Sequence, residues 1–238
     1  MKKYLLLLFM ILFITGCGKN TNELVMVTEA GFAPYEYYEN GEIVGVDVDI
    51  AKEIAKALGK ELVIKDVAFD SIINEVRTGK ADFGAAGISY SEERSESVDF
   101  SLNYVVSKNV VITKVNSNIA LNNIDGKKIA VQLGSIGDTY ATNNFKNSEI
   151  IRQKKYLAAA QDLKTDKVDL IIMDELPAKE IVNVNNDLKI LDGFLTSDSY
   201  GMIVQKGNKE LLDVINKVIN KLKDEGKIDE FILNHTAK

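Results

Sequence analysis

Short apolar runs alternate with helical hydrophobic patterns along most of the chain, and the same order occurs twice. The first copy predicts, in turn, strand 24–27, helix 50–58, strand 62–67, helix 71–78 and strand 81–86. The second predicts strand 128–132, helix 137–145, strand 149–152, helix 157–164 and strand 168–173. Such alternation is typical of βαβ units. We therefore expect an α/β protein of two similar lobes, each a mainly parallel sheet flanked by helices.

Local signals bound two of the predicted helices. Asp49 is expected to cap the helix over 50–58, and Gly59 stands where that helix should end. A longer amphipathic helix is predicted over 209–224. Its apolar stripe consists of Leu211, Ile215, Val218 and Leu222.

Two further apolar, β-rich runs cover 104–113 and 200–204. We infer that the chain crosses between the lobes near 105–108 and returns near 197–200, so that two crossing strands form a hinge. This interpretation assigns 23–105 and 200–238 to lobe 1 and 106–199 to lobe 2. A single continuous domain is the alternative.

The amino end has the layout of a secretory signal peptide. Lys2 and Lys3 precede an uninterrupted apolar run over 4–14, and the small residues Thr15 and Gly16 follow. A run of this length, at about 1.5 Å per residue, is too short to cross a hydrocarbon layer of roughly 30 Å. We therefore expect residues 1–16 to be removed as a signal peptide.

Cys17 is the only cysteine, so the chain cannot form an internal disulfide. The sequence Ile14-Thr15-Gly16-Cys17 resembles the lipobox of bacterial lipoproteins. This resemblance implies that Cys17 is lipidated, with palmitate among its acyl chains, and that residues 17–22 form a tether. In that family the cysteine thiol carries a diacylglycerol, whose two acyl chains give stable anchoring to the outer face of the cell membrane, or within a periplasm. A signal peptide with a stray cysteine is the alternative.

Composition and motifs exclude several classes of function. The formal net charge is −6 and no Lys/Arg cluster offsets it, which argues against a nucleic-acid partner. The sequence contains no Walker loop, dinucleotide fingerprint or metal-spaced Cys/His group. The one histidine, His235, lies near the carboxyl end, which argues against Ser–His or Cys–His catalysis. We expect no catalytic residue, cofactor or metal, and polar groups at strand ends remain as candidates for ligand binding.

Short motifs in a fixed order provide a more specific indication. They are Phe32-x-Pro34-Tyr35-x-Tyr37, Gly45-Val46-Asp47-Val48-Asp49-Ile50, Gly87-Ile88-Ser89-Tyr90-Ser91-Glu92-Glu93-Arg94 with Phe100-Ser101, Gly134-Ser135, Val168-Asp169 with Asp174, and Tyr200-Gly201-Met202. Together they resemble the family 3 solute-binding proteins of polar amino-acid ABC transporters. The resemblance implies a two-lobe, periplasmic-binding-protein-like (type II) fold. It also implies a monomer without enzymatic activity that captures a free L-amino acid by hinge closure and delivers it to ABC transporter permease subunits.

The resemblance further implies partners for the two charges of an amino acid. Arg94 matches the position that binds the α-carboxylate, and its planar fork can donate two parallel hydrogen bonds to that group. Asp174 matches the ammonium-binding position, while Ser89 and Gly87 match positions that meet the ligand through backbone groups and the Ser89 hydroxyl. The alternatives are structural: a helix-start arginine, a helix N-cap at Asp174, a turn cap at Ser89 and a strand end at Gly87.

The side-chain pocket is implied in the same way. Phe32 and Phe69 match positions that sandwich the ligand side chain, Glu29 matches an acidic position at its polar end, and Gln132 lines the same pocket. Aromatic walls with a carboxylate suit a guanidinium, ammonium or amide tip, which favours arginine, lysine, histidine or glutamine. Each phenylalanine is equally compatible with an ordinary core position.

Ser135 and Ile136 open the predicted helix after strand 128–132, where N–H groups can point at the ligand carboxylate. Ile136 departs from the small or polar residue usual at that position. Asp47 and Asp49 mark the family, and we interpret both as structural.

Two other functions remain open at this point. Some proteins of the same fold are cyclohexadienyl dehydratases, in which carboxylates act as acid and base. A sensory ligand-binding module is the other alternative.

Overall fold

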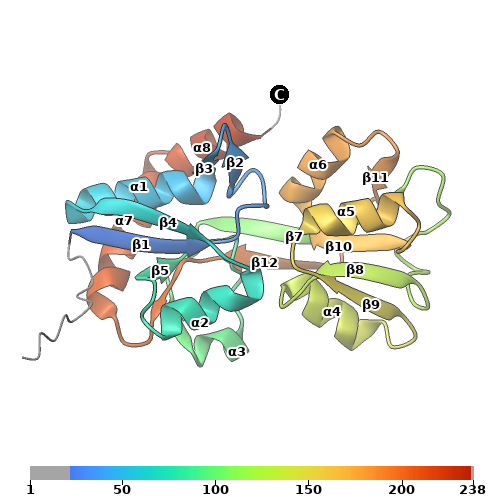
Figure 1. Ribbon diagram of the computed structural model, residues 1–238, viewed down its shortest axis with the longest axis horizontal. Helices are drawn as coiled ribbons and strands as arrows, with labels where there is room; N and C mark the ends of the chain where they lie inside the picture. Colours follow the sequence, from blue (N-terminus) through green and yellow to red (C-terminus); the bar gives the residue numbers. More distant parts are fainter. Residues whose placement is uncertain (1–21, 237–238) are drawn as a thin grey trace, which may run out of the picture.

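The computed structural model describes residues 22–236, which form two large β-sheets with helices on both faces of each, and a separate two-stranded sheet (Figure 1). We call the first sheet with its helices lobe 1 and the second lobe 2. The predicted α/β fold class is confirmed. The predicted signal peptide and Cys17 lie outside the described residues, and the residue bounds assigned to the lobes stay a prediction.

The lobe 1 sheet has the strand order β4-β1-β5-β13-β6. Its strands are β1 (Glu23–Thr28), β4 (Glu61–Asp66), β5 (Phe83–Gly84), β6 (Val98–Phe100) and β13 (Ile203–Gln205). Its other elements are the hairpin β2 (Tyr37–Glu39) and β3 (Glu42–Val44), the 3₁₀ helix η1 (Phe69–Ser71), and helices α1 (Val46–Leu58), α2 (Ile72–Arg77), α3 (Glu92–Ser95), α7 (Lys209–Asp224) and α8 (Lys227–His235). β1 is parallel to β4 and β5, whereas β13 is antiparallel to β5 and β6.

The lobe 2 sheet has the order β11-β7-β10-β8-β9, and β12 pairs with β7. Its strands are β7 (Val105–Lys114), β8 (Lys128–Gln132), β9 (Glu149–Gln153), β10 (Leu170–Asp174), β11 (Leu188–Ile190) and β12 (Thr196–Tyr200). Its helices are α4 (Ile136–Asn144), α5 (Tyr156–Lys164) and α6 (Glu175–Asn183). β8 is parallel to β9 and β10, and β7 is antiparallel to β10, β11 and β12.

Alternation along β1 explains how lobe 1 is layered. Leu24 and Met26 belong to the hydrophobic cluster that α1 and α7 join, whereas Val25 and Val27 belong to the cluster of α2. Successive strand residues point to opposite faces, so α1 and α2 cover opposite sides of the sheet (Figure 1). A fully buried isoleucine such as Ile54 contributes about 1.5–3 kcal/mol to this packing.

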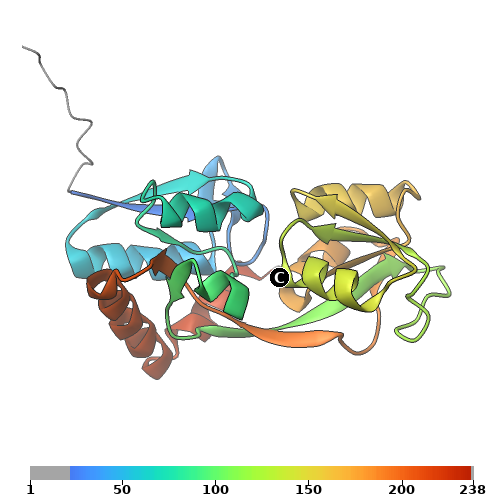
Figure 2. The same ribbon diagram turned by 90° about the horizontal axis from the view of Figure 1, so that it is seen from below.

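Strands β7 and β12 run side by side between the two lobes (Figure 2). They are antiparallel, and their register pairs Val105 with Tyr200 and Lys108 with Ser197. Tyr200 ends β12, and β13 begins at Ile203 in the other sheet. The apolar run over 200–204 is therefore a crossing between sheets and not one continuous strand.

Two local predictions were wrong. α1 begins at Val46 after Gly45, so Asp49 lies inside the helix, where it binds Lys52 and His235 through its two carboxylate oxygens. Gly45 has φ 135°, and a Cβ there would lie 2.1 Å from the Tyr35 carbonyl oxygen, so backbone crowding sets this helix start. The strand predicted over 81–86 pairs only at Phe83–Gly84.

Candidate ligand-binding site

A small cavity lies where the two lobes meet. Its volume is about 10 Å³, room for about one water molecule. The residues that line it are Phe32, Phe69, Ala86, Gly87, Ser89, Arg94, Gln132, Ser135, Ile136, Tyr156 and Asp174. They include nine of the ten ligand-binding residues predicted from the sequence. The tenth, Glu29, accepts a hydrogen bond from Gln132 beside the cavity.

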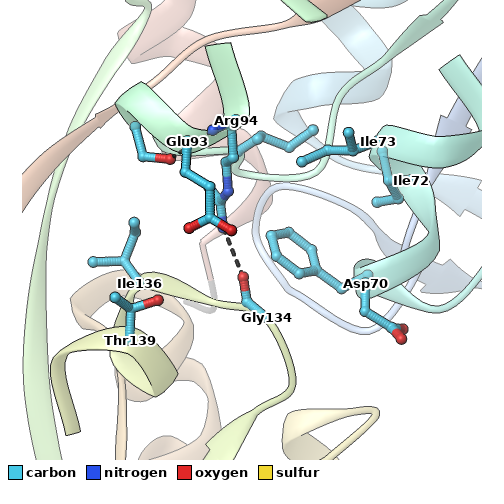
Figure 3. Close-up of a pocket in the computed structure, with 11 residues that line it drawn as sticks. Asp70, Ile72, Ile73, Glu93, Arg94, Gly134, Ile136 and Thr139 are labelled. Atoms are coloured by element: carbon cyan, nitrogen blue, oxygen red, sulfur yellow. Dashed lines mark hydrogen bonds between the residues drawn. The ribbon is translucent and has the colours of Figure 1, made fainter. Parts of the chain in front are cut away.

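Arg94 spans the junction between the lobes. Its backbone N–H donates to Ser91 Oγ, the N-cap of α3, while its guanidinium donates to Ser89 O at 2.6 Å and to Gly134 O of lobe 2 at 2.8 Å (Figure 3). The guanidinium carbon lies 5.6 Å from the centre of the Phe69 ring. Burial lowers the pKa of Arg94, and Asp198 and Asp174 oppose this shift. Arg94 is thus both a helix-start residue and a cation facing the cavity.

A second, larger cavity adjoins Arg94 (Figure 3). Its volume is about 260 Å³, and it shares Phe69, Arg94 and Ile136 with the smaller one. Its other walls include the apolar side chains of Ile72 and Ile73.

Asp174 ends β10 and enters the cavity from lobe 2. It occupies the N-cap position of α6 but makes no side-chain cap bond; instead its Oδ1 accepts from Ser107 Oγ at 2.7 Å. The side chain is buried, and burial, reinforced by the charge of Asp198, raises its pKa to about 7. A cation placed beside Asp174 would favour its ionised form.

Ser89 and Asp198 form a polar contact that sequence analysis did not anticipate. The Ser89 hydroxyl donates to Asp198 Oδ1, and Asn109 Nδ2 donates to Asp198 Oδ2 at 2.9 Å. Ser89 also forms an isolated bridge with Tyr200. Asp198 lies on β12, so the crossing strands hold the loop that carries Ser89.

Glu29 follows β1 and is almost fully buried. Gln132 Nε2 of lobe 2 donates to Glu29 Oε2 at 3.0 Å, and Lys155 Nζ lies 3.0 Å from Glu29 Oε1. Burial raises the pKa of Glu29, and Lys155 opposes the shift. A buried carboxylate is thus paired with groups that come from the opposite lobe.

The two predicted aromatic walls have different surroundings. Phe32 is buried and stacks on Tyr156 of lobe 2, with ring centres 5.7 Å apart, and on Tyr35 at 5.9 Å. Phe69 is half-buried against Arg94. Both line the cavity, so neither is only a core residue.

Comparison with known proteins identifies the class. The family model for bacterial extracellular solute-binding proteins, family 3, matches residues 24–236. The chain belongs to this family.

Individual relatives agree with this family assignment. The chain is 30% identical to the arginine-binding extracellular protein ArtP of Bacillus subtilis, over 97% of this chain and 96% of that protein. It is 31% identical to a probable histidine-binding protein of Campylobacter jejuni, over 98% of each chain. The structure of AbpA from Streptococcus pneumoniae, an amino-acid ABC transporter substrate-binding protein bound to L-arginine, is 38% identical and superposes with a TM-score of 0.85, covering 90% of this chain and 94% of that one.

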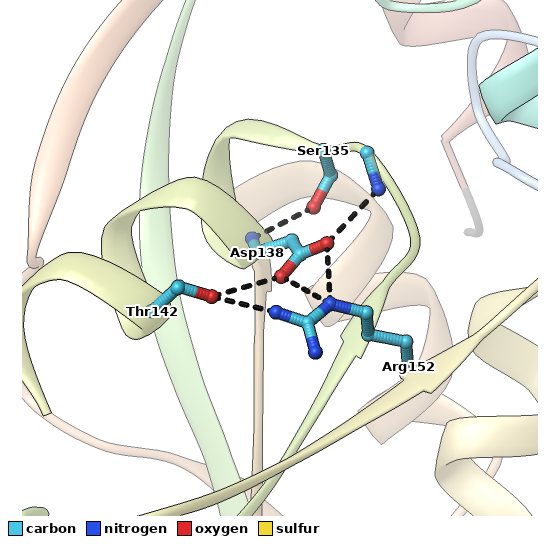
Figure 4. A network of polar contacts seen from close by, with 5 residues as sticks. Ser135, Asp138, Thr142 and Arg152 are labelled. Carbon is cyan, nitrogen blue, oxygen red and sulfur yellow. Dashed lines mark hydrogen bonds and ion pairs between the residues drawn. The ribbon is translucent and has the colours of Figure 1, made fainter. Parts of the chain in front are cut away.

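In this solute-binding protein, a hydrogen-bond network fixes the turn that opens α4 (Figure 4). Asp138 accepts from the Gly134 N–H at 3.1 Å and pairs with Arg152 Nε at 2.9 Å. Ser135 Oγ accepts from the Asp138 N–H, and the Ser135 N–H donates to Gln132 O at 3.1 Å. The Ser135 N–H, predicted together with that of Ile136 to face the ligand carboxylate, therefore has a protein partner in this structure, and its contact with a ligand stays a prediction.

Position 87 can hold only glycine without strain. Its φ is +54°, and a Cβ would approach the Phe32 ring to 2.9 Å. Its N–H donates to Asp47 Oδ2 at 3.0 Å, which ties the cavity wall to the first turn of α1. Burial raises the pKa of Asp47 to about 6. Asp47 is thus a structural support of the candidate site, in line with the structural interpretation of its motif.

Besides Ala86, three polar residues at or beside the cavity were missed from the sequence: Tyr156, Asp198 and Lys155. Lys155 and Tyr156 lie at the start of α5, just before the helix predicted over 157–164, and Asp198 lies in the polar strand β12. Among residues 22–236 there is no group of acidic, histidine or cysteine side chains arranged to hold a metal ion. Within the same range no helix is long and apolar enough to cross a membrane.

Proposed function

We propose that this chain is the extracytoplasmic substrate-binding lipoprotein of an amino-acid ABC importer, and that it binds a free polar or basic L-amino acid. The observation that carries the proposal is the division of opposite charges between the lobes. The Arg94 guanidinium from lobe 1 and the Asp174 carboxylate from lobe 2 line one cavity. They are the complements of an α-carboxylate and an α-ammonium.

Desolvation explains why the charges are divided. Each pole of a zwitterion loses water on burial, at a cost of several kcal/mol unless a protein charge replaces it. With Arg94 on one lobe and Asp174 on the other, only a closed arrangement supplies both partners. The ligand therefore binds the closed form more tightly than the open one and shifts the equilibrium towards closure.

The cavity that Arg94 and Asp174 share is smaller than an amino acid. A space of about 10 Å³ does not hold an amino acid, so contacts across the junction have to give way when a ligand enters. These include the bonds from Arg94 to Gly134 O and from Gln132 to Glu29. The paired strands β7 and β12 form the hinge about which the lobes separate.

The residues beside the cavity favour a cationic or polar side chain. Glu29 is a buried carboxylate, and Phe32 and Phe69 provide aromatic surface. This combination suits a guanidinium, an ammonium or an amide. The names of the relatives, arginine-binding and histidine-binding, support the same preference.

Cleavage before Cys17 and its lipidation would tether the monomer to the membrane, where permease subunits recognise the closed form. This part of the proposal is supported by the resemblance to a lipobox and by the extracellular character of the family. Mass spectrometry of the mature amino-terminal peptide tests it. A diacylated Cys17 is expected, and an unmodified peptide beginning elsewhere would contradict the anchor.

Calorimetric titration of the purified protein against the proteinogenic amino acids tests the binding function. We expect tight binding of one or a few polar or basic L-amino acids. A parallel assay of prephenate turnover separates this function from a dehydratase of the same fold. Turnover without amino-acid binding would overturn the proposal.

A further inference from the structure

Lys155 reaches across the junction to the side-chain end of the proposed site. It occupies the N-cap position of α5 in lobe 2, and its Nζ lies 3.0 Å from Glu29 Oε1 and 3.3 Å from Asp66 Oδ2. Glu29 follows β1 and Asp66 ends β4, so both carboxylates come from lobe 1. The lysine therefore lies where the cationic end of a basic ligand would meet Glu29.

Glu29 and Lys155 differ in how far their side chains are exposed to water. The Glu29 side chain is only 1% exposed, so its charge needs a nearby cation. The Lys155 side chain is 40% exposed, and a lysine head can return to water while its stem stays in place. Lys155 can thus leave Glu29 at little cost, provided that another cation takes its place.

We propose that Lys155 is a specificity-determining residue, an internal cation that competes with the side chain of a basic ligand for Glu29. The inference rests on the proposed amino-acid binding function and adds to it an order of preference between basic and neutral ligands. A basic ligand has to displace the Lys155 ammonium, whereas a neutral amide ligand can share Glu29 with it. Lys155 therefore lowers affinity for arginine relative to glutamine.

If Lys155 competes with the ligand for Glu29, its substitution should strengthen arginine binding. A residue that only joined the two lobes would not have this effect. In Lys155→Met, Glu29 lacks its internal cation, and arginine supplies one while glutamine does not. We expect the ratio of the glutamine Kd to the arginine Kd to rise about tenfold or more, through tighter arginine binding. If Lys155 only held the lobes together, both Kd values would shift by the same factor.

The experiment is calorimetric titration of wild type, Lys155→Met and Lys154→Met with L-arginine and L-glutamine at pH 7. Lys154 is exposed, and its side chain forms no ion pair within residues 22–236, so its substitution removes the same charge from the same segment. The Lys154 variant should leave the ratio unchanged. In Glu29→Gln, adding Lys155→Met should no longer raise the ratio, because the shared partner is gone.

The outcomes separate this inference from the binding function. Equal shifts for both ligands, weaker arginine binding in Lys155→Met, or the same change in the Lys154 variant would overturn the competition and leave amino-acid binding intact. A wild-type protein that binds neither ligand nor any other amino acid would overturn both. Circular dichroism melts of each variant show whether a lost signal comes from misfolding.

Discussion

Replacing Asp174 by asparagine should make the unliganded protein more stable at alkaline pH while it loses its ligand. Burial raises the pKa of Asp174 to about 7 in the folded protein, from its ordinary value of 3.8 in water. Because the folded-state pKa is raised, this group favours folding below pH 3.8, and its contribution is lost as the pH rises through about 7. Above that range the ionised carboxylate is a buried charge that opposes folding.

The size of the effect follows from the shift. A rise of about three pKa units corresponds to at most about 4 kcal/mol of destabilisation at pH 8, because each unit is worth 1.36 kcal/mol. Asparagine keeps an acceptor for the Ser107 hydroxyl, which donates to Asp174 at 2.7 Å, and removes the charge. The free energy of unfolding of Asp174→Asn should therefore exceed that of wild type at pH 8 by a few kcal/mol and approach it at pH 4.

Urea unfolding at pH 4, 6 and 8, followed by circular dichroism, measures this difference, and calorimetry of the same samples measures binding. Removing one partner of a buried charge pair costs about 3 kcal/mol or more, so ligand affinity should fall at least a hundredfold. A variant that is less stable than wild type at pH 8, or that binds ligand normally, would refute this reasoning. Asp169→Asn, a carboxylate on the lobe 2 surface loop, is the matched control for binding.

The other predictions concern the remaining charges of the site. Arg94→Ala should lose roughly a hundredfold or more in affinity by calorimetry, and exposed Arg77→Ala should not; equal effects would contradict a special role for Arg94. Glu29→Gln should weaken the binding of a basic ligand far more than the binding of a neutral one. Equal weakening of both would contradict a pocket that selects ligands by side-chain charge. Wild-type affinity should fall about tenfold between pH 8 and pH 6, because protonation of Asp174 removes the partner of the ligand ammonium; a flat profile would show that Asp174 stays ionised.

Elements with strong local patterns were predictable. The helix over 209–224 matches α7, and Leu211, Ile215, Val218 and Leu222 are all buried, because a 3.6-residue period reports one apolar face. Gly59 ends α1 in a left-handed conformation, which the residue type alone favours. The start of α1 was not predictable, because Gly45 is placed by its close approach to Tyr35, a contact between separate segments.

The residues of the site that the sequence did not reveal also depend on contacts between distant segments. Nine residues predicted from the family resemblance line one cavity, and some of them, such as Gln132 and Asp174, end strands at the junction. Asp198 and Lys155 were missed because their neighbours are set by long-range pairing. Asp198 meets Ser89 only through the register of β12 on β7, and Lys155 meets Glu29 only when the lobes face each other. Neither relation leaves a periodic signal in the sequence.

A crystal structure with a bound amino acid tests the central claim most directly. We expect the ligand carboxylate within 2.7–3.2 Å of the Arg94 guanidinium nitrogens and the ammonium at a similar distance from an Asp174 carboxylate oxygen, with one partner from each lobe. A ligand whose two charges are both held by the same lobe, with Arg94 or Asp174 facing solvent, would contradict the account.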